Sequence, residues 1–170
     1  MTQVQPQKGR QCMARGIQVG DQAPDFTLPS QAGEPVRLYD RLGDRVIVLY
    51  FYPKDNTSGC TAEACAFRDS YEAFTEAGAD VIGVSSDSAD KHASFAGQYK
   101  LPFTLVSDKG GRLRKSYGVP AALGLIPGRV TYVIDREGTV RHVFNSMINI
   151  GQHVSDALDV VKRLQAEQAA

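Results

Sequence analysis

The stretch V-I-V-L-Y-F-Y at Val46–Tyr52 runs directly into P-K-D-N-T-S-G-C-T-A-E-A-C at Pro53–Cys65. The first part is an unbroken apolar run rich in β-branched and aromatic residues, which is typical of a central strand covered on both faces. Pro53 ends this strand, and a polar loop follows. An apolar stripe at helical spacing then predicts a helix from Cys60 to about Ala77, and its members are Ala62, Ala64, Phe67, Tyr71 and Phe74. The sequence thus places a cysteine where a buried strand and its loop turn into a helix.

Strands and helices continue to alternate along the rest of the chain. We predict an early hairpin of 25–28 with 36–38, strands at 80–86, 103–106, 129–134 and 140–144, and helices at 88–99, 111–116 and 152–165. The strand–helix–strand–helix–strand order favours a parallel core with right-handed crossovers, and the late hairpin adds antiparallel strands. This order predicts an α/β protein with a thioredoxin-like fold, in which a mixed central sheet carries helices on both faces.

Length and composition limit the possible functions. The 170 residues fit one domain, and 19 basic residues balance 19 acidic ones, so nucleic acid and an anionic membrane surface are not expected partners. No apolar run approaches the roughly 20 residues of a spanning helix. The polar, Gln-rich segment 1–15 is predicted to be a disordered leader, with a single domain over 16–170. Cys12 lies in this leader, and Met13 is a candidate natural start.

Cys60 is the cysteine that the surrounding pattern marks as reactive. It falls in the first turn of a predicted helix, where unpaired backbone N–H groups and the positive end of the helix dipole favour thiolate over thiol. Thr57 lies three residues earlier, where its hydroxyl could point to the same place. The alternative is an inert core cysteine near a turn, which the irregular loop argues against.

Cys65 follows Cys60 by five residues in the sequence. In one regular helix their Cα atoms are roughly 8–9 Å apart, whereas a disulfide needs Cα atoms within about 7 Å. The two thiols therefore either never pair or pair with unwinding of the first turns. The C-x₄-C spacing is a poor zinc signature because the three histidines, His92, His142 and His153, are scattered. The C-x-x-C of a general dithiol reductase is absent, and we expect neither a metal nor a cofactor.

No histidine is paired with Cys60 by the sequence, so the group that supports a thiolate must be another one. Arg129, at the start of a predicted core strand, is the better candidate, because a guanidinium is permanently charged and stabilises a thiolate without exchanging protons. From the residues alone, a surface charge on an edge strand is the favoured interpretation of Arg129.

The segment F-Y-P-K-D-N-T-S-G-C-T-A-E-A-C-A-F-R-D strongly resembles peroxiredoxins of the Q type, also called the bacterioferritin comigratory protein family. Supporting stretches cover about 20–164: P-D-F-T-L at 24–28, V-I-G-V-S-S-D-S at 81–88, H-x-x-F at 92–95, L-P-F-T-L-V-S-D at 101–108, Y-G-V at 117–119 and R-V-T-Y-V-I-D at 129–135. The combination of Pro-x-x-x-Thr-x-x-Cys with a downstream arginine is highly specific.

The resemblance implies a thiol peroxidase that reduces hydrogen peroxide and organic hydroperoxides. Cys60 would be the peroxidatic cysteine and Cys65 the resolving one, giving an intramolecular disulfide that thioredoxin or a similar dithiol reduces. Thr57 would hydrogen-bond the peroxide and the thiolate, Pro53 would shield the site from water, and Arg129 would hold both thiolate and peroxide. One further residue, Glu63, matches a usual acidic position after the catalytic cysteine. It would act on the site residues without contacting the peroxide. Members of this type are more often monomers than dimers.

Two departures from the family pattern are visible. Ser58 stands where the family usually has proline, which loosens the loop backbone. The stretch 118–128 is apolar where many members are basic or aromatic, which fits a docking surface and a simple covering loop equally well.

Two other functions use the same residues or the same fold. A peroxide sensor or redox relay would pass oxidation from Cys60 to a partner protein, and a thioredoxin-fold binding module would need no reactive cysteine. The expected location is the cytoplasm, or an organelle such as a plastid if a transit peptide has been removed.

Overall fold

The computed structural model describes residues 15–122 and 124–170, and its centre is a five-stranded mixed sheet in the order β5-β4-β3-β8-β9. These strands are β3 (Val46–Phe51), β4 (Ala79–Ser85), β5 (Thr104–Ser107), β8 (Val130–Ile134) and β9 (Val140–Asn145). β3 pairs in parallel with β4 and antiparallel with β8. The predicted thioredoxin-like mixed sheet is confirmed.

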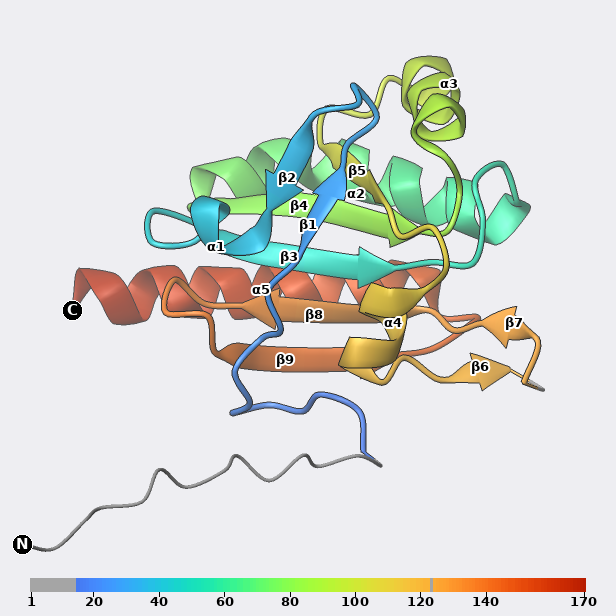
Figure 1. The fold of residues 1–170 in the computed structure, drawn as a ribbon. Helices are drawn as coiled ribbons and strands as arrows, with labels where there is room; N and C mark the ends of the chain where they lie inside the picture. The colour runs from blue at the N-terminus through green and yellow to red at the C-terminus, as the bar shows by residue number, and fades with distance from the viewer. Residues whose placement is uncertain (1–14, 123) are drawn as a thin grey trace, which may run out of the picture.

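Helices cover both faces of this sheet (Figure 1). They are α1 (Leu38–Arg41), α2 (Ser58–Glu76), α3 (Ala89–Tyr99), α4 (Arg112–Tyr117) and α5 (Ile150–Ala169). The hairpin β1 (Thr27–Pro29) and β2 (Pro35–Arg37) lies on the same face as α4, and a small hairpin of β6 (Ala121–Ala122) and β7 (Ile126–Pro127) precedes β8. α1, β6 and β7 are additions to the predicted elements.

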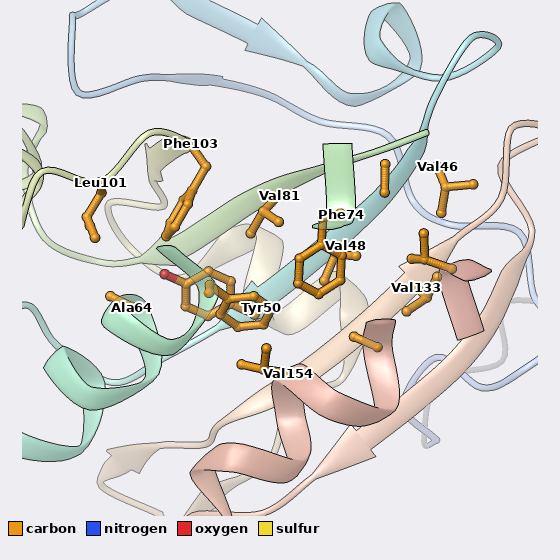
Figure 2. Packing of buried hydrophobic residues seen from close by; sticks show 14 of the residues in the cluster. Val46, Val48, Tyr50, Ala64, Phe74, Val81, Leu101, Phe103, Val133 and Val154 are labelled. Atoms are coloured by element: carbon orange, nitrogen blue, oxygen red, sulfur yellow. The ribbon is translucent and has the colours of Figure 1, made fainter. Parts of the chain in front are cut away.

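The side chains of β3 supply both cores, because successive residues of a strand point to opposite faces. Val46, Val48 and Tyr50 pack with α2 and α5 in one cluster, while Ile47 and Leu49 pack with α1 and α4 in the other. Figure 2 shows the first cluster, in which Tyr50 lies among residues of α2, β4 and α5. Every residue of β3 is buried, as its unbroken apolar run predicts.

Strand register decides which distant residues meet at one end of the sheet. Phe51, the last residue of β3, is paired with Val84 on one side and with Val130 on the other. The loop that leaves β3 therefore begins beside Arg129, the residue before Val130. In mixed sheets of this kind, such strand ends are where sites form.

One prediction lies almost wholly outside the described residues. The leader over 1–15, with Cys12, is described only at Arg15, so the structure leaves this prediction untested. Within the described ranges, no helix is both long and apolar enough to cross a membrane.

Candidate active site

The first turn of α2 carries Cys60. Thr57 is the N-cap residue, its carbonyl accepts the first helical bond from the N–H of Thr61 at 2.8 Å, and its side chain makes no cap hydrogen bond. The backbone N–H groups of the residues from Thr57 to Cys60 have no acceptor within the helix. They form a set of donors, at the positive end of a helix dipole, beside a thiol that is 1% exposed.

Arg129 reaches this thiol from the neighbouring strand. Its Nη2 donates to Sγ of Cys60 at 3.3 Å, and its Nη1 donates to Oε2 of Glu63 at 2.5 Å. The guanidinium is only 3% exposed, so its charge is weakly screened where the thiolate would form. Although burial opposes the charged form, Glu63 and Cys60 outweigh it, and the pKa of Arg129 is raised. The reading of Arg129 as a surface charge is wrong.

Glu63 is completely buried one turn after Cys60. Burial raises its pKa to about 7, although the charge and hydrogen bond of Arg129 act in the opposite direction. Its Oε1 has no hydrogen-bond partner among the described residues. The arginine that contacts the thiol therefore also contacts a carboxyl, that of Glu63, whose protonation changes near neutral pH.

Thr57 and Pro53 lie in the loop that joins β3 to α2. Pro53, which is half-buried, directly follows the buried Tyr52. The hydroxyl of Thr57 donates to the carbonyl of Lys54 at 3.1 Å, and its side chain is exposed. Thr57 is therefore next to the first turn of α2 without a hydrogen bond between its side chain and the thiol. Ser58 is the first residue of α2, so the lack of a proline there does not prevent the helix from starting.

Cys65 lies within the same helix as Cys60, and both thiols are free. The helix is continuous from Ser58 to Glu76, so their Cα atoms are roughly 8–9 Å apart by helix geometry. Cys65 is half-buried. This helical arrangement excludes a direct disulfide, and a bond between the two sulfurs requires the first turns of α2 to open.

A second polar cluster, which no local sequence pattern predicts, holds the loop before α2. The carboxylate of Asp55 contacts Nδ1 of His92 at 2.7 Å and accepts from the hydroxyl of Tyr52 at 2.6 Å. Nη2 of Arg114 donates to the carbonyl of Tyr52 at 3.0 Å. Asp55 belongs to the P-K-D-N-T segment and His92 to the H-x-x-F motif, but only strand register shows that these two motifs meet.

The apolar stretch 118–128 forms the β6–β7 hairpin, with residue 123 outside the described part. Leu125 and Ile126 are 87% and 49% exposed, so these two side chains cover no core. In the described ranges, no group of three or more histidine, cysteine or acidic side chains is placed to hold a metal ion.

The fold and the start of α2 together define a class of protein. A thioredoxin-like sheet presents a buried cysteine at a helix N-terminus, in hydrogen-bond contact with a buried arginine. This is the arrangement of a thiol-based oxidoreductase, in which the sulfur itself carries the electrons.

Comparison with known proteins identifies the family within this class. Residues 19–143 match the AhpC/TSA family. The chain is 49% identical over 147 residues to the chloroplastic peroxiredoxin Q of Sedum lineare, covering 86% of this chain and 78% of that protein. Its structure is similar to the peroxidoxin BcpB of Mycobacterium tuberculosis, with a TM-score of 0.80, 38% identity, and coverage of 85% and 96% of the two chains.

A third relative is the bacterioferritin comigratory protein of Xanthomonas campestris, whose structures concern alkyl peroxide reduction. The TM-score is 0.75 at 29% identity, covering 82% of this chain and 92% of that one. The chain belongs to the AhpC/TSA family. It is a thiol-dependent peroxidase, an oxidoreductase whose substrate is a peroxide and whose reductant is a thiol.

Proposed function

We propose that Cys60 is the peroxidatic cysteine of this peroxidase. The observation that carries the proposal is the 3.3 Å contact from Nη2 of Arg129 to its sulfur. Hydrogen bonds to an ionised partner are about twice as strong as neutral ones, and this contact favours the thiolate. In the first step the thiolate attacks the O–O bond of the peroxide, forming an S–O bond as the O–O bond breaks. Cys60 becomes a sulfenic acid, and the leaving oxygen takes up a proton to give water or an alcohol.

The neighbouring residues have separate roles in this step. Arg129 holds the thiolate and the developing charge on the leaving oxygen, while Glu63 fixes the guanidinium from its other side. Thr57 would hydrogen-bond the peroxide after its hydroxyl turns away from the carbonyl of Lys54. Pro53 covers the thiol from the end of β3 and limits access of water.

In the second step, Cys65 acts as the resolving cysteine. Its sulfur attacks the sulfenic sulfur of Cys60, the S–S bond forms, and the hydroxyl leaves as water with the thiol proton. The continuous helix must open to bring the sulfurs together, and local opening of a helix end costs far less than global unfolding. A dithiol reductant such as thioredoxin then takes over the disulfide and restores both thiols.

The substrate range, assembly and location are part of the same proposal. We expect hydrogen peroxide and organic hydroperoxides as substrates, supported by the alkyl peroxide work on the Xanthomonas relative. A monomer suffices, because the proposed site draws on one chain. A reducing compartment is needed to keep the thiols free, which the cytoplasm and the plastid both provide. The chloroplastic relatives support the plastid.

Intact mass after one equivalent of hydrogen peroxide tests the pathway. The wild-type chain should lose about 2 Da, whereas Cys65→Ser should gain about 16 Da as a trapped sulfenic acid. Cys60→Ser should show neither change, and Cys12→Ser serves as a cysteine control that keeps full turnover. Unchanged peroxide consumption by Cys60→Ser would refute the assignment. Consumption that stops after one turnover with a thioredoxin system present would favour a sensor or relay.

A further inference from the structure

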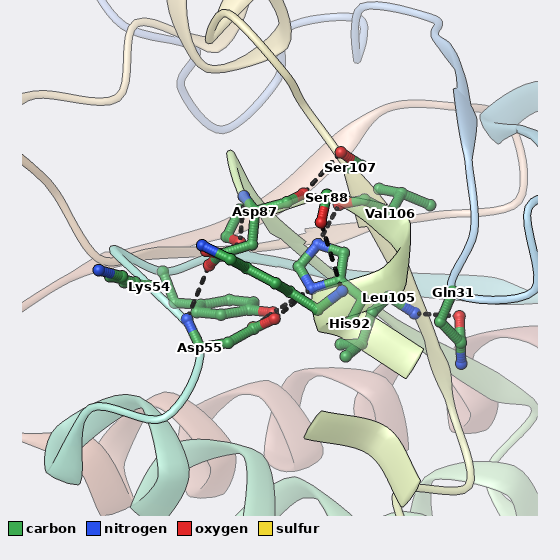
Figure 3. Close-up of polar contacts among 12 residues, drawn as sticks. Gln31, Lys54, Asp55, Asp87, Ser88, His92, Leu105, Val106 and Ser107 are labelled. Carbon is green, nitrogen blue, oxygen red and sulfur yellow. Dashed lines mark hydrogen bonds and ion pairs between the residues drawn. The ribbon is translucent and has the colours of Figure 1, made fainter. Parts of the chain in front are cut away.

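Asp55 and His92 form a buried polar pair that the reaction above does not use. They are 5% and 0% exposed, and Oδ2 of Asp55 lies 2.7 Å from Nδ1 of His92. Asp55 belongs to the loop before α2, and His92 belongs to α3. Figure 3 shows the side chain of Asp55 extending from its loop to the ring of His92.

Both ring nitrogens of His92 have hydrogen-bond partners. Its Nε2 lies 3.1 Å from the carbonyl of Val106, which can only accept, so Nε2 carries a proton. Nδ1 faces the Asp55 carboxyl at 2.7 Å, so His92 is held through both of its ring nitrogens. Removing either partner leaves a buried polar group without its counterpart.

The same loop residue is also fixed through its backbone. The N–H of Asp55 donates to Oδ2 of Asp87 at 2.8 Å, just beyond β4. The hydroxyl of Ser85 donates to the same Asp87 oxygen at 3.0 Å, and the hydroxyl of Ser107 donates to the Asp87 carbonyl at 2.6 Å. Side chain and backbone together tie Asp55 to β4, α3 and β5 (Figure 3).

The chain becomes exposed to solvent immediately after Asp55. Asn56 has a left-handed backbone with φ of 61°, and the side chains of Asn56, Thr57 and Ser58 are exposed. Cys60 and Glu63 are the buried residues of 56–63, and the side chains of both are hydrogen-bonded to Arg129. Ala64 and Phe67, which are 1% and 0% exposed, begin the part of α2 that packs without such a polar contact.

We propose that Asp55 and His92 are positioning residues. They set the N-terminal limit of the segment that opens during the reaction. The pair keeps Pro53–Asp55 in place while 56–63 unwinds and carries Cys60 toward Cys65, so that the peroxide pocket reforms when the disulfide is reduced. The inference rests on the proposed function for the disulfide step. Its structural part, the anchoring of the loop in the reduced protein, stands on the contacts alone.

His92→Phe tests the anchor because it keeps a ring of similar size and removes both hydrogen bonds. Amide hydrogen exchange at Lys54 and Asp55 in the reduced protein should accelerate about tenfold or more, as expected for losing a buried hydrogen bond to a charged partner. His92→Asn, whose amide replaces Nδ1 only, should restore part of the protection. If His92→Phe does not fold, His92→Asn carries the test with roughly threefold acceleration against wild type.

Tyr71→Phe is the matched control. Tyr71 lies on α2 beyond Cys65, and the variant removes the 2.9 Å hydrogen bond from its hydroxyl to Oδ1 of Asp80 on β4. Exchange at Lys54 and Asp55 should not change in this variant. Equal acceleration in Tyr71→Phe and His92→Phe would show general destabilisation and overturn the inference.

The rates of the two chemical steps give a second readout. A general loss of stability would not slow one step and spare the other. The chain has no tryptophan whose fluorescence could report the steps, so the rates are followed by quenched-flow mass spectrometry. In His92→Phe, oxidation of Cys60 by peroxide should slow about tenfold, because the loop no longer shapes the pocket. Conversion of the sulfenic acid to the disulfide should be as fast as in wild type or faster. Equal slowing of both steps contradicts the proposal.

The two proposals fail separately. If wild-type protein forms no Cys60–Cys65 disulfide after peroxide, the proposed function fails, yet exchange in the reduced protein still tests the anchor. If the disulfide forms but exchange at Lys54 and Asp55 is the same in wild type and His92→Phe, the anchor is wrong and the proposed function stands.

Discussion

The guanidinium of Arg129 lies 3.3 Å from the sulfur of Cys60, although 69 positions separate the two residues in the chain. The contact exists because β8 pairs antiparallel with β3, which places Val130 beside Phe51. Cys60 lies in the first turn of α2, the helix that follows β3. The other terminal nitrogen of the same guanidinium, Nη1, donates to Glu63, so one buried arginine contacts both the thiol and the carboxyl.

Replacing Arg129 should reduce the reactivity of Cys60. Loss of a hydrogen bond to a charged group costs about 1.5–3 kcal/mol, so Arg129→Met should slow alkylation of Cys60 by iodoacetamide roughly tenfold to a hundredfold at neutral pH. The measurement uses a Cys65→Ser, Cys12→Ser background, in which Cys60 is the only thiol. Arg129→Met also leaves Glu63 buried without its partner, so Arg129→Met with Glu63→Gln is the control for folding. Alkylation no faster in the native wild type than in urea would refute an activated thiol.

Glu63 should make stability depend on pH in a defined direction. Folding raises its pKa from 4.5 to about 7, so the folded chain binds this proton more tightly than the unfolded chain. The resulting stabilisation is fully present below pH 4.5 and is lost as the pH rises through about 7, amounting to at most about 3 kcal/mol. Glu63→Gln cannot titrate, so the unfolding free energy of wild type minus that of the variant should fall over this range. A difference that is constant between pH 4.5 and 8 contradicts this prediction.

The sequence predicted the sheet and the long helices because their apolar patterns are strong. The unbroken apolar run Val46–Tyr52 favoured a buried strand, and the apolar stripe of α2 predicted its inner face. α1, β6 and β7 were missed because they are two to four residues long and too short to show a period. Such elements are decided by tertiary contacts, which a local pattern does not contain.

The site could be predicted only in part, for a physical reason. The helix start marks Cys60 through local chemistry, and the family resemblance supplied Arg129, whose partner Cys60 lies on α2, 69 positions away. Nothing in the local sequence indicates that Glu63 is completely buried or that Asp55 contacts His92. Both relationships depend on strand register, which places side chains from distant segments within one buried space.

Formation of the disulfide should be accompanied by loss of helix at the start of α2. Both cysteines lie in one continuous helix, which keeps their Cα atoms beyond disulfide range. Amide exchange across Thr57–Ser70 should therefore be faster in the oxidised protein than in the reduced one, while α5 should show no difference. Cys65→Ser treated with peroxide is the control, because it is oxidised but cannot form the bond. Equal protection of Thr57–Ser70 in both redox states would exclude the opening.

Adding one methyl group at Gly59 should affect activity and stability in opposite directions. A Cβ at this position would lie 3.2 Å from Nη2 of Arg129, which is tight enough to displace the guanidinium from Cys60. Peroxide turnover in Gly59→Ala should fall roughly threefold to tenfold through the weakened hydrogen bond. Alanine is favoured over glycine within a helix by about 0.5–1 kcal/mol, so the melting temperature should not fall.

Gly97→Ala is the matched control for this last prediction, because Gly97 lies in α3 and a Cβ there meets nothing within 4 Å. It should gain the same helix stability and keep wild-type turnover. If Gly59→Ala keeps wild-type turnover as well, the position of the guanidinium tolerates a shift of a few tenths of an ångström. The contact between Arg129 and Cys60 would then matter through charge and not through hydrogen-bond geometry, and Arg129→Lys should retain most of the activity.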